Sequence, residues 1–293
     1  MSWLHVVILA LVQGMAELLP VSSSAHVIVA AALLRENMST PANALLLVLL
    51  HTGTMFAVIA YFWRRWVEEF LSSWERFVRF VKLTFVASLL TGVVGYPIIE
   101  AIQHWLGAEG QPAVIEALFN RLNWIAPALA AVGVLILVAG LREARRKETA
   151  AERAAGRSTL TWPTVAWMGV LQGLALPFRG FSRSGSTISA GLLNGGERAE
   201  IESFSFLLAV AITPLAIGRE FYRVVKAAHA AAVPVPFAAV MTPGALGMVC
   251  AFLAGLLALR WLSSWLESGR WHWFGVYCLG AAAVVQILYL RGW

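Results

Sequence analysis

The sequence predicts an all-α polytopic membrane protein, and three observations favour that fold class. The chain of 293 residues is 59% hydrophobic and only 13% charged, whereas soluble domains carry roughly 25% charged residues. Its mean hydropathy is +0.74. Apolar runs of about 20 residues, the length that crosses a bilayer as a helix, recur along the whole chain. The 13 tryptophans also suit the aromatic belts at the two membrane surfaces.

Six segments are long and apolar enough to be transmembrane helices. They run roughly over 43–62, 83–104, 124–141, 203–222, 237–260 and 272–290. The segments 2–34 and 161–194 are also apolar, but Pro, Gly and Ser interrupt each of them in its middle. Each interruption leaves two half-length helical pieces, which is typical of a re-entrant helical hairpin. Because irregular backbone at membrane depth must be surrounded by protein or water, we expect the two breaks to be buried together as the walls of one site.

The two interrupted segments are degenerate copies of one motif. Each begins Gln-Gly-x-Ala, at Gln13 and at Gln172, and then reaches a proline and a run of serines. The similarity continues weakly at an offset near 160 residues, which aligns Ser22 with Ser182. The chain is therefore predicted to be a single integral membrane domain, 1–293, made of repeat 1 (about 1–141), a basic cytoplasmic linker (142–159) and repeat 2 (about 160–293).

The distribution of charge predicts the orientation of these repeats. Three crossings separate the two hairpins, and because this number is odd the second copy enters from the opposite side, as in inverted repeats that build a site at the bilayer midplane. Most of the net charge of +6 falls in two connecting segments, Arg64 to Lys82 and Arg142 to Arg157. Both lie on one side, which the positive-inside rule makes cytoplasmic. The termini are then external. This pattern is not a nucleic-acid-binding face, so we expect no nucleic acid partner.

The two breaks carry ionisable side chains where charge is costly. Glu17 and His26 belong to the first break, and Arg179 and Arg183 belong to the second. One charge at the centre of a membrane helix costs about 2.5–3.5 kcal/mol on insertion scales, so these residues are candidates for function. In each hairpin the serines begin a helical piece, whose unsatisfied N–H groups form a ready site for an anion. The planar fork of arginine suits a phosphate, so the first hypothesis is a membrane site for a phosphate group.

A carboxylate in a phosphate pocket needs its own explanation, because Glu17 would repel a bare phosphate. The presence of Glu17 therefore implies that a metal ion bridges it to the phosphate, that it binds a proton, or that it acts as a general base. Mg²⁺ commonly lies between a carboxylate and the phosphates of a substrate. Gln13 precedes Glu17 by four residues and shares its helix face. A purely structural ion pair between Glu17 and Arg183 is the competing interpretation, but it leaves the hydroxyl cluster unexplained.

Structural roles compete with functional ones elsewhere. Helix capping explains Ser22 as well as substrate contact does, whereas Ser23 is assigned to function because His26 follows three residues later. Arg179 has snorkelling or a local ion pair as its alternative. His51 lies in an apolar span beside a glycine, and packing is its predicted role.

The two motifs resemble those of the undecaprenyl-diphosphate phosphatases, the membrane enzymes associated with bacitracin resistance. The first family motif is Glu or Gln, three residues, Glu, and then Pro-Val-Ser-Ser and a His; it is matched by Gln13, Glu17, Pro20, Val21, Ser22, Ser23 and His26. The second motif, Pro-Gly-x-Ser-Arg-Ser-x-x-Thr, is matched by Gly180, Ser182, Arg183, Ser184 and Thr187. Arg179 stands where the family usually has Pro, which bears on the backbone of the hairpin. The resemblance in length and span pattern covers essentially the whole chain.

The resemblance implies hydrolysis of undecaprenyl diphosphate to the monophosphate, which regenerates the lipid carrier for peptidoglycan synthesis. It implies a bacterial inner-membrane protein whose site opens to the external, periplasmic side, and a divalent cation, Mg²⁺ or Ca²⁺, with Glu17 as its ligand. By the family's pattern the catalytic residues would be Glu17, Ser23, His26 and Arg183. The substrate-binding residues would be Gln13, Ser22, Ser182, Ser184 and Thr187. The implied partners are the polyprenyl diphosphate and membrane lipid, and the sequence leaves a monomer and a homodimer open.

Two alternatives stay open at this point. The attacking group is Ser23 assisted by Glu17 or His26, His26 itself, or a water activated by Glu17. We favour Ser23 because it lies at the predicted start of a helix. A transporter or flippase of a polyprenyl phosphate is the alternative function, since inverted repeats with broken helices are transporter architecture. Transport does not require the combination of carboxylate, serine and histidine, and a purely structural scaffold would not need buried charge.

Overall fold

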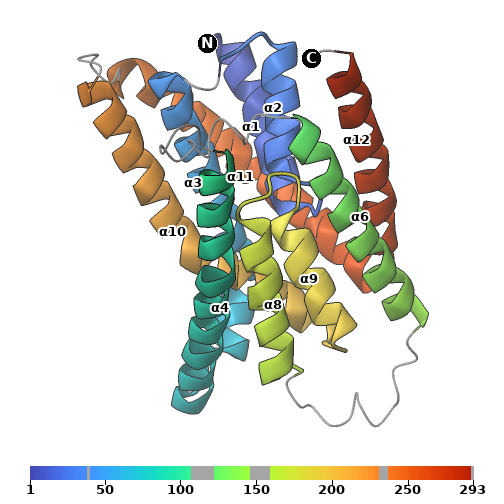
Figure 1. Ribbon diagram of the computed structural model, residues 1–293. Helices are drawn as coiled ribbons and strands as arrows, with labels where there is room; N and C mark the ends of the chain where they lie inside the picture. The colour runs from blue at the N-terminus through green and yellow to red at the C-terminus, as the bar shows by residue number, and fades with distance from the viewer. Residues whose placement is uncertain (38–39, 107–121, 146–158, 231–236, 292–293) are drawn as a thin grey trace. The chain divides into compact units, whose positions relative to one another are not determined.

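The computed structural model describes residues 1–37, 40–106, 122–145, 159–230 and 237–291, and within these ranges its regular structure is entirely helical (Figure 1). The helices are α1 (Trp3–Leu18), α2 (Ser23–Leu33), α3 (Pro41–Glu69), α4 (Trp74–Leu106), α6 (Leu122–Arg145), α8 (Trp162–Ala175), α9 (Arg183–Leu193), α10 (Arg198–Ala230), α11 (Phe237–Glu267) and α12 (His272–Leu290). The all-α fold class is confirmed.

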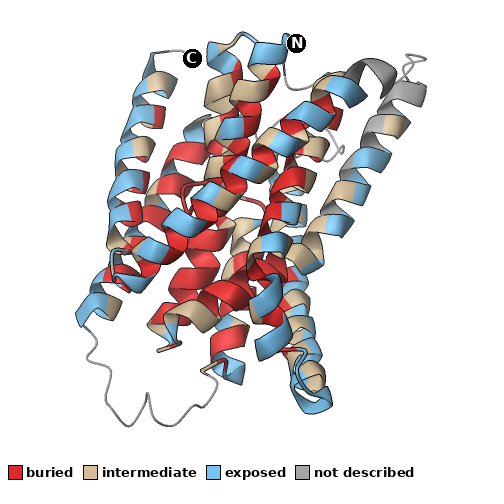
Figure 2. Ribbon diagram, turned by 180° about the vertical axis from the view of Figure 1, so that it is seen from behind, coloured by how far each residue is buried: buried red, intermediate tan, exposed pale blue. Residues whose placement is uncertain are grey.

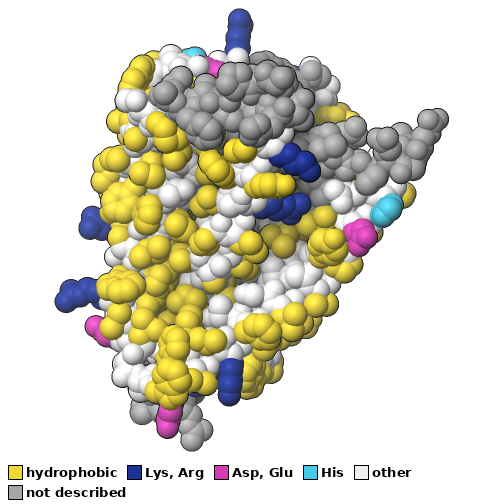
Figure 3. Space-filling model, turned by 90° about the vertical axis from the view of Figure 1, so that its left-hand side faces the viewer, with side chains coloured by type: hydrophobic (Ala, Val, Ile, Leu, Met, Phe, Trp, Pro, Cys, Tyr) yellow, Lys and Arg dark blue, Asp and Glu magenta, His cyan; other side chains and the backbone are white. Residues whose placement is uncertain are grey.

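Six of these helices are long and apolar enough to cross a membrane, as the sequence predicts, and they are α3, α4, α6, α10, α11 and α12. The protein is therefore a multi-pass membrane protein. Figure 2 shows the long helices with buried residues along one side and exposed residues along the other. Large apolar side chains are exposed at helical spacing on α4, where Phe85, Leu89 and Val93 are 65%, 53% and 59% exposed. Figure 3 shows a face on which hydrophobic side chains gather and charged ones are few. Such a surface suits lipid better than water.

The predicted ends of several spans were wrong. The helix expected at 83–104 begins at Trp74, and the one expected at 43–62 continues to Glu69. The connection between them is therefore residues 70–73 alone, and most of the basic residues from Arg64 to Lys82 lie on helix ends. The hydrophobicity of a sequence window indicates only which residues can lie in the lipid. The helix itself continues into the polar region for as long as its backbone hydrogen bonds continue. Residues 142–145 of the predicted linker likewise end α6, and 146–158 lie outside the described residues.

Half-length helices flank both predicted breaks. α1 and α2 pack against each other, as do α8 and α9. Pro20 follows the end of α1, and the residue before it, Leu19, has extended backbone with ψ of 150°, as expected before a proline. At the second break Gly180 has φ of +108°, and a Cβ there would lie 2.6 Å from the carbonyl oxygen of Ile125. Only glycine fits that position.

The described residues divide into two compact units, each of which draws on both sequence repeats. Unit 1 comprises Met1–Leu19, Ser23–Arg65 and Ala209–Leu262, and unit 2 comprises Pro20–Ser22, Trp66–Leu208 and Ser263–Trp293. The core of unit 1 joins α1, α2, α3 and α11 through Val6, Leu9, Ala10, Val27, Ala31, Leu45, Leu46, Leu50 and Ala251. In unit 2, α6 packs along α12, and α4 packs along α8.

Glycine contacts within the two units follow the period of the sequence repeat. In unit 1 a Cβ on Gly14 would lie 2.6 Å from the carbonyl oxygen of Ala251 and 2.7 Å from Cβ of Ala254. In unit 2 a Cβ on Gly173 would lie 2.8 Å from the carbonyl oxygen of Thr91 and 2.9 Å from Cβ of Val94. The two glycines are 159 positions apart, and the residues that they meet are 160 positions apart. Each broken segment therefore packs against a long helix of the other repeat through equivalent residues.

Candidate functional site

The first motif forms a hydrogen-bonded cluster around one carboxylate oxygen in unit 1. Gln13 and Glu17 lie one turn apart on α1, and Gln13 Nε2 donates to Glu17 Oε2 at 3.0 Å. Ser23, the first residue of α2, donates its hydroxyl to the same oxygen at 2.5 Å. The carboxylate is partly exposed, with 18% of the side chain accessible, while Gln13 is buried. The structure thus brings together three of the predicted site residues.

This geometry suits removal of a proton from Ser23. A carboxylate that accepts a short hydrogen bond from a hydroxyl is placed to act as a general base, which makes the hydroxyl oxygen more nucleophilic. Ser23 also begins α2, where the positive end of the helix dipole favours negative charge. His26 lies one turn further along α2, on the same helix face as Ser23 and half-buried.

His51, whose predicted role is packing, lies beside the carboxylate. Its Nδ1 lies 2.8 Å from the carbonyl oxygen of Leu47, and its Nε2 lies 3.7 Å from Glu17 Oε2. Because a carbonyl only accepts hydrogen bonds, Nδ1 carries a hydrogen and Nε2 is the atom that faces Glu17. No sequence spacing relates α3 to α1, so only the histidine's presence in an apolar span hinted at this contact.

The second repeat lacks this carboxylate. Gln172 is the counterpart of Gln13, but four residues later the chain has Leu176 in place of Glu17. Gln172 is buried and donates through Nε2 to Thr91 Oγ1 at 3.1 Å, while its Oε1 accepts no hydrogen bond from a described residue. Both repeats therefore have a glutamine at the same position, but the two glutamines bind different partners. Only the first repeat has a carboxylate at the position of the candidate base.

The second motif builds the start of α9 in unit 2. Ser182 caps the helix, and its Oγ accepts from the backbone N–H of Gly185 at 3.2 Å. Arg183 is the first helical residue and is partly buried. Thr187 lies one turn on, but its hydroxyl donates to the Arg183 carbonyl at 2.9 Å and bonds Ser205 Oγ at 2.6 Å.

The remaining substrate-binding candidates of this motif are also buried at the start of the helix. Ser184 and Thr187 are 3% and 0% exposed, and residues 184–192 are buried throughout. The Ser182 bond to Gly185 and the Thr187 bond to Arg183 lie within α9 and its N-cap, and the bond from Thr187 to Ser205 joins α9 to α10. No motif in the sequence marks Ser205 as a partner. Substrate contact by these hydroxyls stays a prediction.

Aromatic and glycine contacts hold the turn before α9, in which Arg179 stands at the position where the motif usually has proline. Phe178 and Trp124 stack with ring centroids 6.4 Å apart, which ties the turn to the beginning of α6. The N–H of Phe181 donates to the Phe178 carbonyl at 3.0 Å. Arg179 lies inside this turn and is partly buried. These contacts define the hairpin without the proline that usually precedes Gly180 in the motif.

The break of the first hairpin, Pro20–Ser22, belongs to unit 2, the unit that contains α9. Within that unit Cys278 Sγ donates to the Pro20 carbonyl at 3.2 Å. Ser22 is 5% exposed and has φ of +67°, a left-handed conformation that costs energy for a residue with a Cβ. Strain of this kind gathers at functional sites. Whether Glu17 and Arg183 face one pocket stays a prediction.

Comparisons with known proteins agree with the motifs. Residues 6–284 match the model of the family described as bacitracin resistance protein BacA. The chain is 44% identical over 290 residues to undecaprenyl-diphosphatase 2 of Acinetobacter baylyi, with 98% of each chain covered. It is 32% identical to undecaprenyl-diphosphatase of Rhodopirellula baltica, again over 98% of each. Undecaprenyl-diphosphatase of Thermus thermophilus is 31% identical, with 99% of this chain and 98% of the relative covered. With both motifs present and nearly the whole chain matched, the protein is a member of the bacitracin resistance protein BacA family.

Proposed function

We propose that this protein hydrolyses undecaprenyl diphosphate to undecaprenyl phosphate and inorganic phosphate, and so recycles the lipid carrier for cell-wall synthesis. The names of its relatives support this substrate and reaction. The single observation that carries the proposal is the 2.5 Å hydrogen bond from Ser23 to Glu17 at the start of α2. A lipid-binding or transporting protein has no need of a hydroxyl held against a base.

In the proposed reaction, Ser23 Oγ attacks the terminal phosphorus while Glu17 Oε2 takes its proton. The bond from that phosphorus to the bridging oxygen breaks, and undecaprenyl phosphate leaves with the electron pair. Water then hydrolyses the phosphoserine and restores the enzyme. Gln13 holds the carboxylate toward Ser23, and the start of α2 stabilises the negative charge that develops nearby. A water activated by Glu17 and attack by His26 are the competing routes.

Arg183 is proposed to neutralise the phosphates from the second hairpin. It is the first residue of α9, so its guanidinium and the helix N-terminus are cationic features of one segment. The convergence of the two motifs on one substrate rests on the family motifs and on the predicted inverted repeat. The planar guanidinium of Arg183 would contact two phosphate oxygens at once.

A divalent cation, Mg²⁺ or Ca²⁺, fits the residues of the first motif. The described residues contain no group of three or more His, Cys, Asp or Glu side chains arranged to hold a metal. Mg²⁺ is often held by one or two carboxylates together with substrate phosphates, so Glu17 would be the protein ligand of a site that the substrate completes. The cation would neutralise phosphate charge when bound.

The positive-inside rule supports a cytoplasmic-membrane protein with the basic ends of α3, α4 and α6 in the cytoplasm and the first hairpin open to the external side. This is the side on which the lipid diphosphate would be met after cell-wall precursors are used.

Phosphate release by the purified protein tests the function. The assay uses undecaprenyl diphosphate in neutral detergent, where no membrane separates two sides, so transport cannot produce a signal. We expect Mg²⁺-dependent release that a chelator abolishes and added Mg²⁺ restores. If the protein binds the lipid but releases no phosphate, the transporter or flippase is favoured. If phosphate release persists in the presence of a chelator, the proposed requirement for a divalent cation is refuted.

A further inference from the structure

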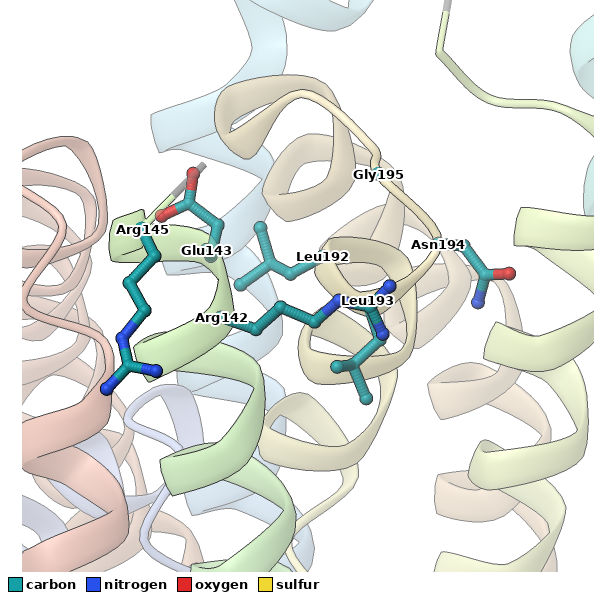
Figure 4. A pocket seen from close by; sticks show the side chains of 7 residues that line it. All are labelled: Arg142, Glu143, Arg145, Leu192, Leu193, Asn194 and Gly195. Atoms are coloured by element: carbon teal, nitrogen blue, oxygen red, sulfur yellow. The ribbon is translucent and has the colours of Figure 1, made fainter. Parts of the chain in front are cut away.

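A pocket of about 480 Å³ lies in unit 2 at the ends of α6 and α9, at the opposite end of α9 from its serine motif. Its walls are the last turn of α6, the last turn of α9 and the Asn194–Gly195 turn (Figure 4). In Figure 4, Arg142 extends from α6 toward the end of α9, and the guanidinium of Arg145 points away from α9. The volume is within the range of small-ligand sites.

The charge of this pocket is positive. Glu143 also lines it, but its carboxylate accepts from Arg198 Nε at 2.7 Å and is therefore already neutralised. Neither Arg142 nor Arg145 forms an ion pair with a residue in the described ranges. Arg142, which extends toward the end of α9, is thus placed to meet an anion, and Arg145 adds a second positive charge on the last turn of α6. Arginine pairs with phosphate through two parallel hydrogen bonds.

The C-terminus of α9 repels an anion less than a helix C-terminus with unpaired carbonyl groups would. Asn194 donates to the Ala190 carbonyl through both its backbone N–H and its Nδ2. Gly195 N–H donates to the Leu192 carbonyl, so these carbonyls are satisfied inside the protein. The remaining partial negative charge of the two helix ends is smaller than the two positive charges of the arginines.

α6 also carries an exposed apolar surface in the turns before the pocket. Val134, Val138 and Leu141 are 52%, 50% and 41% exposed. They follow one another at spacings of four and three residues, and Arg145 continues the same stripe. Because Asn123–Arg145 is a candidate membrane span, we expect its last turn at the membrane surface.

We propose that this pocket binds the phosphate headgroup of an anionic phospholipid, with the phosphate at Arg142, the charge of Arg145 nearby on α6, and an acyl chain along the exposed stripe of α6. Basic pockets between transmembrane helices on the cytoplasmic side are suited to anionic headgroups. The apolar approach favours a lipid over free phosphate, because inorganic phosphate gains nothing from the stripe. A zwitterionic headgroup would bring its own cation next to the two arginines and bind less tightly. This proposal does not depend on the catalytic one.

Native mass spectrometry of the full-length protein in neutral detergent tests the proposal with phosphatidylglycerol and phosphatidylcholine of matched chain length. We expect the wild type to retain phosphatidylglycerol preferentially, and Arg142→Gln/Arg145→Gln to bind it roughly 10- to 30-fold more weakly. The matched control is Arg64→Gln/Lys82→Gln, which removes the same formal charge from exposed sites on other helices and should bind like the wild type. Both double variants should melt within a few degrees of the wild type and keep phosphate-release activity.

Three outcomes would overturn the proposal. Equal lipid affinity of the wild type and Arg142→Gln/Arg145→Gln would show that the pocket is not the site. Equal losses in the two double variants would show that general surface charge binds the lipid. If millimolar inorganic phosphate displaces phosphatidylglycerol and protects the wild type equally from heat, the pocket takes free phosphate and the lipid assignment is wrong. Should Arg142→Gln/Arg145→Gln fail to fold, Arg142→Gln alone gives the same comparison with Arg64→Gln.

Discussion

Replacement of Glu17 by glutamine separates the chemistry of the carboxylate from its structural role. The hydrogen bonds from Gln13 and Ser23 both end on Glu17 Oε2. An amide oxygen has two lone pairs, so a glutamine can place its oxygen there and accept both bonds. The substitution therefore keeps the local geometry and removes the negative charge. We expect the melting temperature to change by only a few degrees.

The effect on turnover should be large. A positioned general base typically contributes 10²- to 10⁴-fold to the rate, which corresponds to about 3–5 kcal/mol of activation free energy. The lost carboxylate would also weaken a bound divalent cation, so kcat should fall by at least 10²-fold at saturating Mg²⁺. The assay is phosphate release from undecaprenyl diphosphate by the purified variant, with kcat and KM measured separately.

Glu36 provides a matched control in the same unit. Its side chain is 17% exposed, close to the 18% of Glu17, and it is bound to His5 at 2.7 Å instead of to the serine motif. Glu36→Gln should keep near wild-type kcat. If Glu17→Gln retains a third or more of wild-type kcat, the carboxylate belongs to the structure of the hairpin and the proposed base is refuted.

Three further outcomes are expected. Ser23→Ala should abolish turnover while the lipid still binds, and a slow wild-type reaction quenched with detergent denaturant at neutral pH should contain acid-stable phosphoserine; an acid-labile phosphohistidine in the same sample would overturn the choice of nucleophile. Gly14→Val should lower the melting temperature and cost about 1–3 kcal/mol of stability, since a Cβ there meets the Ala251 carbonyl at 2.6 Å; an unchanged melting temperature would contradict this close packing. A reporter fused after Trp293 should behave as external and one within 145–155 as cytoplasmic, and finding both on one side would break the inverted topology.

The local features of the fold could be predicted from the sequence because they depend on nearby residues. Proline and serine runs mark the ends of half-length helices, and apolar runs mark the six spans. Gln13 and Glu17 meet because four residues make one helical turn. The ends of α3 and α4 were missed because charged residues continue a helix beyond the lipid without any change of backbone pattern.

Contacts between distant segments could not be predicted in this way. His51 reaches Glu17 only because α3 packs beside α1 in the core of unit 1. Ser205 bonds Thr187 because α10 returns to α9, and no motif marks that serine. The assignment of Glu17 and Ser23 to one site rested partly on the family resemblance, while their hydrogen bond is an observation of the structure.

The activity of Arg183→Ala tests most directly the claim that both hairpins serve one hydrolytic site. The matched control is Arg179→Pro, which alters a neighbouring arginine of the same turn and restores the residue usual in the motif. Phosphate release from undecaprenyl diphosphate is measured for both purified variants at saturating Mg²⁺. We expect Arg183→Ala to lose at least 10²- to 10³-fold in kcat/KM, the loss typical when a donor to a developing negative charge is removed, Arg183→Lys to lose most of the activity, and Arg179→Pro to remain active. An Arg183→Ala protein with near wild-type release would contradict the account at its centre.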